Sequence, residues 1–74
     1  MPVSIHLRGD HITLANALKV AGAAESGGQA KIKVREGDVR LNGAVETKPG
    51  RKLRAGDKIA IGEQEWVIEA SAET

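Results

Sequence analysis

An Asn-Gly pair at positions 42 and 43 separates two short segments of this 74-residue chain. A type I′ turn needs positive φ at both central residues, and Asn followed by Gly meets that need better than most pairs. We therefore predict a β-hairpin in which Asp38–Leu41 pairs with Ala44–Thr47. Strand alternation would bury the valine and the leucine of the first strand and expose Arg40 on the opposite face.

A helix is predicted immediately before this hairpin, over Gly27–Glu36. Ser26 and Gln29 have the Ser-x-x-Gln spacing of a capping box, in which each side chain accepts a hydrogen bond from the backbone N–H of the other residue. The glycine that follows the segment provides a left-handed stop. The middle of the segment also alternates like a strand, but the two end signals outweigh that pattern. A helix would place Lys31 and Arg35 on one face.

The remaining elements follow from alternation, caps and turn residues. In chain order we predict an edge strand at Val3–Leu7, a helix at Leu14–Ala21 between a Thr13 cap and a Gly22 stop, a turn at Pro49-Gly50, a basic crossing segment at Arg51–Arg54, a bend at Ala55–Asp57, a hairpin of Lys58–Ile61 with Glu65–Glu69 around three turn residues, and a frayed tail at Ser71–Thr74. This order predicts an α+β fold, with two short helices packed on a small, mostly antiparallel sheet.

The length of the chain predicts a single domain over residues 1–74 with a small core. Its parts would be a core motif at 14–57 and a carboxy-terminal hairpin at 58–69. The core has to be aliphatic, because Trp66 is the only aromatic residue and is itself expected to be a packing residue. The predicted aliphatic core residues are Ile5, Leu7, Leu14, Leu18, Val34, Val39, Leu41, Leu53, Ile59, Ile61 and Ile68.

Several classes of protein are disfavoured by composition. The chain has no cysteine and no apolar run of signal-peptide or membrane-spanning length, which favours a soluble, cytoplasmic protein. His6 and His11 lack an acidic residue at metal-ligand spacing, and Glu63 and Glu65 flank a turn as solvated charges. With no nucleophile or phosphate-loop motif either, we expect no enzymatic activity, no cofactor, no small-molecule substrate, and a monomer.

Positive charge is concentrated in one half of the sequence. Residues 31–58 hold nine of the eleven basic residues and four of the ten acidic ones, a net charge of +5 against −4 for the remainder. Such segregation suits one surface that meets a polyanion, and its four arginines match phosphate groups with a planar fork. Lys33 is left out because its helical phase differs from that of its neighbours. The residues predicted to contact phosphate groups of the polyanion are Lys31, Arg35, Arg40, Lys48, Arg51, Lys52 and Arg54.

Five short motifs follow one another between Leu14 and Asp57. They are a helix ending in Ala21-Gly22, Ser26 followed by Gln29-Ala30-Lys31, the hairpin segment from Gly37 to Gly43, the turn Thr47-Lys48-Pro49 and the bend Ala55-Gly56-Asp57. In this order and at these separations they resemble the S4-type RNA-binding domain, also called the αL motif. The string from Glu25 to Lys31 is also similar to that of the small free-standing bacterial members, the YbcJ-like group.

The resemblance implies a ribosome-associated accessory protein whose partner is structured RNA, either ribosomal RNA or a ribosome-assembly intermediate. Members of the family usually carry Arg directly after the N-cap serine, whereas this chain has Gly27, so one phosphate contact of the family is missing. Helix amino-termini bind anions, and glycine leaves their amides accessible. We hypothesise that Ser26, Gly27 and Gly28 replace that contact in part.

The scarcity of aromatic residues favours structured RNA over single strands. Proteins that read single strands stack bases on several aromatic rings, and Trp66 lies outside the basic segment. A rigid basic surface would instead read the RNA backbone and groove shape. The alternative is a protein-interaction module whose basic face docks an acidic or ribosomal protein partner. Steep salt dependence of RNA affinity would distinguish the first function from the second.

Overall fold

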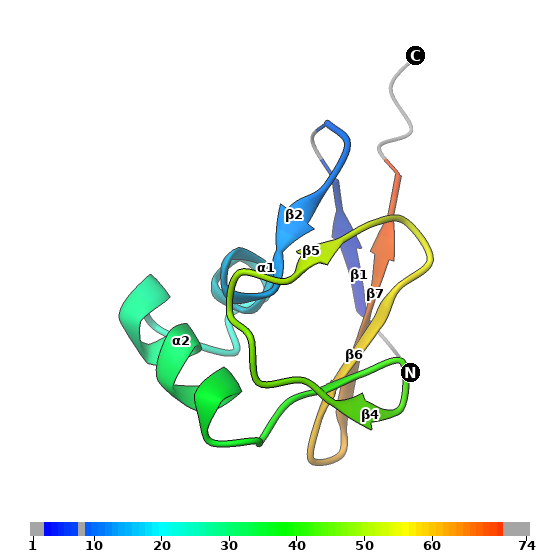
Figure 1. Cartoon of the computed structure of the whole chain (residues 1–74). Helices are drawn as coiled ribbons and strands as arrows, with labels where there is room; N and C mark the ends of the chain where they lie inside the picture. The colour runs from blue at the N-terminus through cyan, green and yellow to red at the C-terminus, as the bar shows by residue number, and fades with distance from the viewer. Residues whose placement is uncertain (1–2, 8, 71–74) are drawn as a thin grey trace.

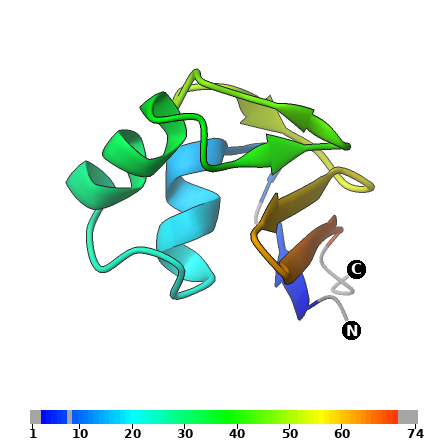
Figure 2. The same cartoon turned by 90° about the horizontal axis from the view of Figure 1, so that it is seen from below.

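Two helices lie on one side of a five-stranded sheet in the computed structural model, which describes residues 3–7 and 9–70 (Figure 1). In chain order the elements are β1 (Val3–His6), β2 (Ile12–Thr13), α1 (Leu14–Val20), α2 (Gly27–Arg35), β3 (Arg40–Leu41), β4 (Ala44–Val45), β5 (Lys52–Leu53), β6 (Lys58–Ile61) and β7 (Gln64–Glu69). The strand order is β1-β7-β6-β3-β4, and β2 pairs separately with β5. The view from below shows α1 between α2 and strands β6 and β7 (Figure 2).

One strand pair in the described part of the chain is parallel. β1 runs alongside β7, with Ile5 beside Ile68, and the other pairs are antiparallel. Pairing continues past β1, since the Leu7 N–H donates to the Glu69 carbonyl at 2.8 Å. The predictions of an α+β fold, of two short helices on a mostly antiparallel sheet and of an amino-terminal edge strand are therefore confirmed.

Side-chain caps begin both helices, as the sequence predicts. The Thr13 hydroxyl accepts a hydrogen bond from the Asn16 N–H at 3.3 Å. The Ser26 hydroxyl accepts one from the Gln29 N–H at 3.2 Å. The other half of the predicted capping box is wrong by one residue, because the Gln29 side chain accepts from the Glu25 N–H at 3.1 Å and not from Ser26. The Gln29 side chain is long enough to bind the residue before the cap, and this bond fixes the main chain that leads into α2.

Glycines in left-handed backbone follow both helices. Gly22 has φ 78° and Gly37 has φ 83°, a conformation that glycine adopts without steric cost. The helices end at Val20 and Arg35, one residue before the predicted ends. A shift of this size is within the usual fraying of a last helical turn, so both predicted stops are confirmed.

The Asn-Gly hairpin forms with the predicted turn and with shorter strands. Asn42 (φ 53°) and Gly43 (φ 88°) both have positive φ, as a type I′ turn requires. β3 and β4 have two residues each instead of the predicted four. The Glu46 N–H still donates to the Val39 carbonyl at 3.0 Å, so the two segments stay together beyond the regular ladder.

The second hairpin joins β6 and β7 by a tighter turn than predicted. Gln64 already pairs with Ile61, which leaves Gly62 and Glu63 as the only turn residues. Gly62 has φ 59°, consistent with a type II′ turn, in which glycine takes the first central position. The prediction of a three-residue turn was therefore wrong, because β7 begins one residue earlier than predicted, at the polar Gln64.

The core joins the inner face of the five-stranded sheet to both helices and to β5. Ten of the eleven predicted aliphatic core residues are buried, and Ile61 is half-buried at the margin. Trp66 is 5% exposed, which confirms it as a packing residue. Sequence reasoning missed the small side chains. Ala17 and Ala30 are fully buried on the two helices, where small residues permit close packing of the helix axes, and Ala15 and Ala24 are buried beside them.

Two other expectations concern the ends and the setting of the chain. The predicted frayed tail at Ser71–Thr74 lies outside the described residues. Within residues 3–7 and 9–70, the helices are too short to cross a membrane.

Candidate nucleic-acid interface

The outward face of α2 carries two of the predicted RNA-binding residues. Ala30 and Val34 are fully buried, whereas Lys31 and Arg35 are exposed one helical turn apart. Lys33 is half-buried, in keeping with its different helical phase. The helix therefore presents a cationic strip beside its apolar face, as the sequence predicts.

The first turn of α2 has two glycines, of which Gly28 is exposed and Gly27 is half-buried. A Cβ at Gly27 would meet no atom within 4 Å, and one at Gly28 would meet only the Ser26 hydroxyl, at 3.8 Å. Both residues have ordinary helical backbone, so neither packing nor conformation requires glycine there. Glycine is the poorest helix former after proline, at about 1 kcal/mol relative to alanine in a helix interior. Two glycines at this helix start therefore have no stabilising role in the fold.

The connection between β4 and β5 is held against the start of α1. The Arg51 carbonyl accepts the Leu14 N–H at 2.8 Å, and the Pro49 carbonyl accepts the Ala15 N–H at 3.1 Å. The same segment forms a turn, which is closed by a hydrogen bond of 3.1 Å from the Arg51 N–H to the Lys48 carbonyl. These bonds satisfy amides that a helix start otherwise leaves unpaired. They also fix the main chain from which the exposed Lys48 and Arg51 side chains project.

This connection brings two cation-carrying segments that are distant in the sequence next to one another. Figures 1 and 2 both show it passing beside α1 and the carboxy-terminal half of α2. Lys31 and Arg35 therefore lie on the element next to the one that carries Lys48 and Arg51. We call the exposed cations of α2, of this connection and of β5 the cationic surface; its members are Lys31, Arg35, Lys48, Arg51, Lys52 and Arg54.

The members that follow the connection flank a buried leucine. Leu53 is fully buried, so strand alternation turns Lys52 and Arg54 outward, and both are exposed. The Arg54 N–H donates to the Asp57 carboxylate at 2.8 Å, which fixes the bend after β5. Main-chain geometry therefore sets the positions of these side chains.

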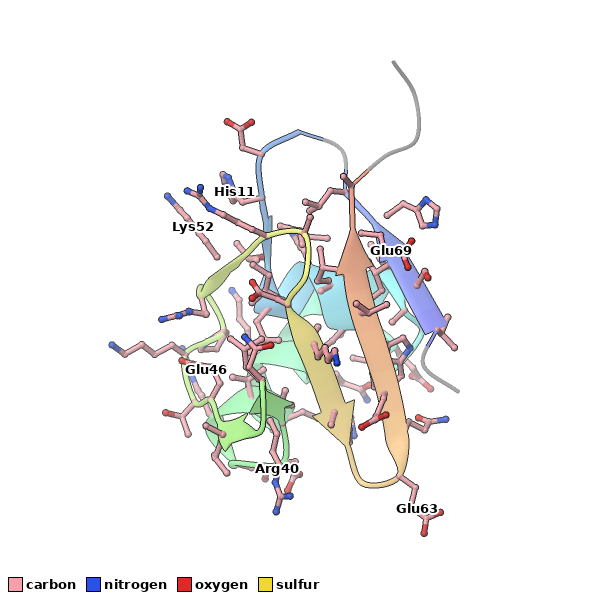
Figure 3. All side chains as sticks on the ribbon, turned by 90° about the vertical axis from the view of Figure 1, so that its right-hand side faces the viewer. His11, Arg40, Glu46, Lys52, Glu63 and Glu69 are labelled. Atoms are coloured by element: carbon pink, nitrogen blue, oxygen red, sulfur yellow. The ribbon has the colours of Figure 1, made fainter. Side chains whose placement is uncertain are left out.

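Arg40 is exposed as predicted, but it belongs to another part of the surface. Figure 3 shows the side of the sheet that faces away from the helices, with Arg40 at its lower end and Lys52 beside His11 at its upper left. Glu46 lies between the two cations in this view. The seven predicted residues thus form the cationic surface and a separate position at Arg40. Whether each of them contacts RNA stays a prediction.

Sequence reasoning did not select Lys58, the exposed first residue of β6. Lys58 and Arg40 line one open groove on the outer side of the sheet. Alternation with the buried Ile59 would have identified the outward direction of Lys58. In the described part of the chain, no group of three histidine, aspartate or glutamate side chains is placed to hold a metal ion.

A family model described as the S4 domain matches residues 5–69. The chain belongs to the S4 domain family. Its resemblance to this family, predicted from five short motifs, is thus confirmed over nearly all of the described chain. The S4 match extends past those motifs to include the β6–β7 hairpin and the second half of β1.

Relatives within the S4 domain family share much of this sequence. YbcJ of Escherichia coli (strain K12), named as a candidate RNA-binding protein, is 46% identical over 51 residues, which are 69% of this chain and 73% of YbcJ. RlbA of Bacillus subtilis (strain 168), named with a provisional role in ribosome maturation, is 40% identical over 60 residues, which are 81% of this chain and 82% of RlbA. The solution structure of E. coli YbcJ, described as having an αL motif involved in RNA binding, superposes with a TM-score of 0.72 at 35% identity, covering 95% of this chain and 90% of that one.

Most of the S4 motif residues in this chain have structural tasks. Ser26 caps α2, Gly37 ends it, Asn42 and Gly43 form the hairpin turn, and Asp57 binds the bend after β5. The cationic side chains lie between these positions. The motif therefore specifies a scaffold, and the exposed residues carried by that scaffold decide what the chain can bind.

Proposed function

We propose that this chain is a non-catalytic protein that binds structured RNA through the cationic surface, and that its target is ribosomal RNA or a ribosome-assembly intermediate. One observation carries the proposal. The carbonyls of Pro49 and Arg51 anchor the β4–β5 connection to α1, and this connection, which carries Lys48 and Arg51, passes beside α2 (Figures 1 and 2). A surface whose main chain is fixed in this way suits an RNA backbone that is itself fixed in shape.

The burial of Trp66 supports a folded RNA over a flexible strand. Its side chain is 5% exposed, and it is the only aromatic residue in the sequence. Stacking of successive bases on aromatic rings is the usual basis of single-strand binding. Phosphate and sugar contacts from basic side chains are what remain for this surface.

The start of α2 would add a phosphate contact. Gly27 and Gly28 leave the first-turn amides open, at a cost in helix propensity that the fold does not require. A helix amino-terminus attracts anions through its free N–H groups and its dipole. Together with Ser26, these residues would replace in part the arginine that S4 domains usually carry after the cap.

The relatives support the type of target. YbcJ is named as a candidate RNA-binding protein and RlbA as a candidate ribosome maturation protein. Both matches cover more than two thirds of this chain and of the relative. We extend this to the present chain as binding to ribosomal RNA during or after assembly of the ribosome.

Anisotropy titrations of a folded ribosomal RNA fragment at several salt concentrations test the proposal. Each phosphate contact contributes about 0.7–0.9 to the slope of log affinity against log salt. Arg51→Gln should weaken binding and reduce the magnitude of the slope by about 0.7–0.9, the contribution of one phosphate contact. The matched control Lys19→Gln removes the same charge from an exposed position of α1 and should change neither quantity by a comparable amount.

Two outcomes would contradict the proposal. Equal effects of Arg51→Gln and Lys19→Gln would mean that overall charge, and not the cationic surface, attracts the RNA. A shallow salt slope, together with an acidic protein partner that stays bound after nuclease treatment, would favour the protein-docking alternative.

A further inference from the structure

An open groove of about 780 Å³ lies on the side of the five-stranded sheet that faces away from the helices, the side seen in Figure 3. Its volume is within the range of about 300–1,000 Å³ typical of small-ligand sites. Turn glycines line it, among them Gly43, Gly56 and Gly62. A Cβ at any of these three would meet no atom within 4 Å, so the main chain there is open to a ligand.

Three groove residues lie side by side on neighbouring strands. Ala60 of β6 is the register partner of Arg40 on β3 and of Glu65 on β7. Each of the three is adjacent in its strand to a buried core residue, namely Leu41, Ile59 or Trp66, so alternation turns Arg40, Ala60 and Glu65 toward the groove. Adjacent strands lie about 4.8 Å apart, which places the Cα atoms of Arg40 and Glu65 about 10 Å apart. Between them the floor is the methyl group of Ala60.

This arrangement offers hydrogen-bond donors on one side, acceptors on the other and an apolar floor. Guanine has the matching edges. Its O6 and N7 accept two hydrogen bonds from an arginine, and its N1–H and 2-amino group, on the other edge, donate to two carboxylate oxygens. Adenine would turn its 6-amino donor toward the arginine, and pyrimidines lack N7. The chemistry of the groove therefore favours guanine over the other bases.

We propose that the groove takes an unpaired guanine of the bound RNA, with the base lying on Ala60 between Arg40 and Glu65. This inference rests on the proposed function, because the cationic surface would deliver the nucleotide. Gly37 and Asp38 line the groove and follow Glu36, the C-cap residue of α2, so the groove begins close to the end of that helix. Lys58 lines the same groove and is placed to neutralise the phosphate of the extruded nucleotide.

The openness of the groove argues for a nucleotide within RNA over a free guanine nucleotide. One face of the base would rest on the sheet while the other stays in solvent, so the groove alone would hold it weakly. Phosphates held by α2 and the β4–β5 connection raise the effective concentration of the neighbouring base. The groove would then contribute selectivity, and the cationic surface would contribute most of the affinity.

The test uses four RNA hairpins of one stem sequence, with a bulged G, a bulged A, a bulged U or no bulge, titrated against the full chain. We expect the bulged-G hairpin to bind at least about tenfold more tightly than the other three. Ala60→Leu, which fills the floor, and Glu65→Gln, which removes one acceptor, should each abolish that preference while leaving the fully paired hairpin bound as before. Val67→Leu enlarges a side chain of β7 outside the groove and should keep the preference. Thermal melts establish that each variant is folded.

The outcomes separate this inference from the proposed function. If the wild-type chain binds all four hairpins with equal affinity, or if Ala60→Leu keeps the preference, the guanine groove is wrong while RNA binding stands. If it binds none of them at low salt, the proposed function fails first. Free GMP that competes as strongly as the bulged-G hairpin would overturn RNA as the source of the guanine.

Discussion

Asn42 and Asp57 are joined by a hydrogen bond of 3.1 Å from the Asn42 side-chain amide to the Asp57 carboxylate. Both side chains also bind the main chain. The Asn42 side-chain oxygen accepts the Lys58 N–H at 2.9 Å, and the second Asp57 carboxylate oxygen accepts the Arg54 N–H at 2.8 Å. The Asn42 N–H adds a bond to the Lys58 carbonyl at 2.8 Å. These bonds lock the hairpin turn to the bend after β5.

Removal of this link should destabilise the fold. Asp57→Ala deletes two side-chain hydrogen bonds, and we expect a loss of about 1–2 kcal/mol in the free energy of unfolding, measured by urea denaturation. Asn42→Gly removes the amide but keeps a residue that tolerates φ 53°. A double-mutant cycle between the two should give a coupling energy of about 0.5–1.5 kcal/mol. Strict additivity would show that the two side chains act independently.

A substitution at the start of α2 should change the stability of the fold and the affinity for RNA in opposite directions. Gly28→Ala adds a methyl group where only the Ser26 hydroxyl is near, and it should raise the free energy of unfolding by about 0.5–1 kcal/mol. The same methyl group would obstruct the approach of a phosphate, so RNA affinity should fall several-fold. A variant that is more stable and binds RNA as well as the wild type would remove the first turn of α2 from the interface.

Substitution of the glycine that ends α2 should lower the free energy of unfolding, whereas Gly28→Ala should raise it. Gly37 has φ 83°, and an added Cβ would make only an ordinary contact of 3.7 Å with Val45. Gly37→Ala should therefore lose about 1–2 kcal/mol from backbone strain alone, measured by denaturant unfolding. Gly50→Ala is the matched control, because Gly50 has open space around it and no positive φ. Equal losses from both variants would rule out the left-handed conformation as the cause.

Trp66 provides a spectroscopic prediction that needs no mutation. With one tryptophan in the chain and its side chain 5% exposed, fluorescence reports a single buried site. We expect blue-shifted emission, weak quenching by iodide, and little change when structured RNA is added. Strong quenching by RNA would mean that a base stacks on Trp66, contrary to the proposed mode of binding.

Local signals were sufficient for most of the elements. The Asn-Gly pair, the Ser26 cap and the glycine after α2 each act within a few residues, and the structure has each where the sequence predicts it. Alternation likewise gave the buried side of β3. Errors of one residue arose where a long side chain or a strand end could choose between adjacent partners, as with Gln29 and Gln64.

Contacts between distant segments were not predictable in the same way. The parallel pairing of β1 with β7, the Asn42–Asp57 bond and the anchoring of the β4–β5 connection join residues far apart in sequence. No local pattern encodes such a register, because it depends on how the whole core closes. For that reason the sequence placed Arg40 with the other cations, whereas the sheet turns it toward a separate groove.

The two carbonyls that cap α1 imply that the basic segment has no independent recognition ability. A synthetic peptide of residues 46–54 would lack the amides of Leu14 and Ala15 that shape it. It would behave as a flexible polycation, attracted equally to folded transcripts, denatured transcripts and heparin. Discrimination among polyanions would then be a property of the folded chain, lost on heating at the same temperature as its tertiary structure.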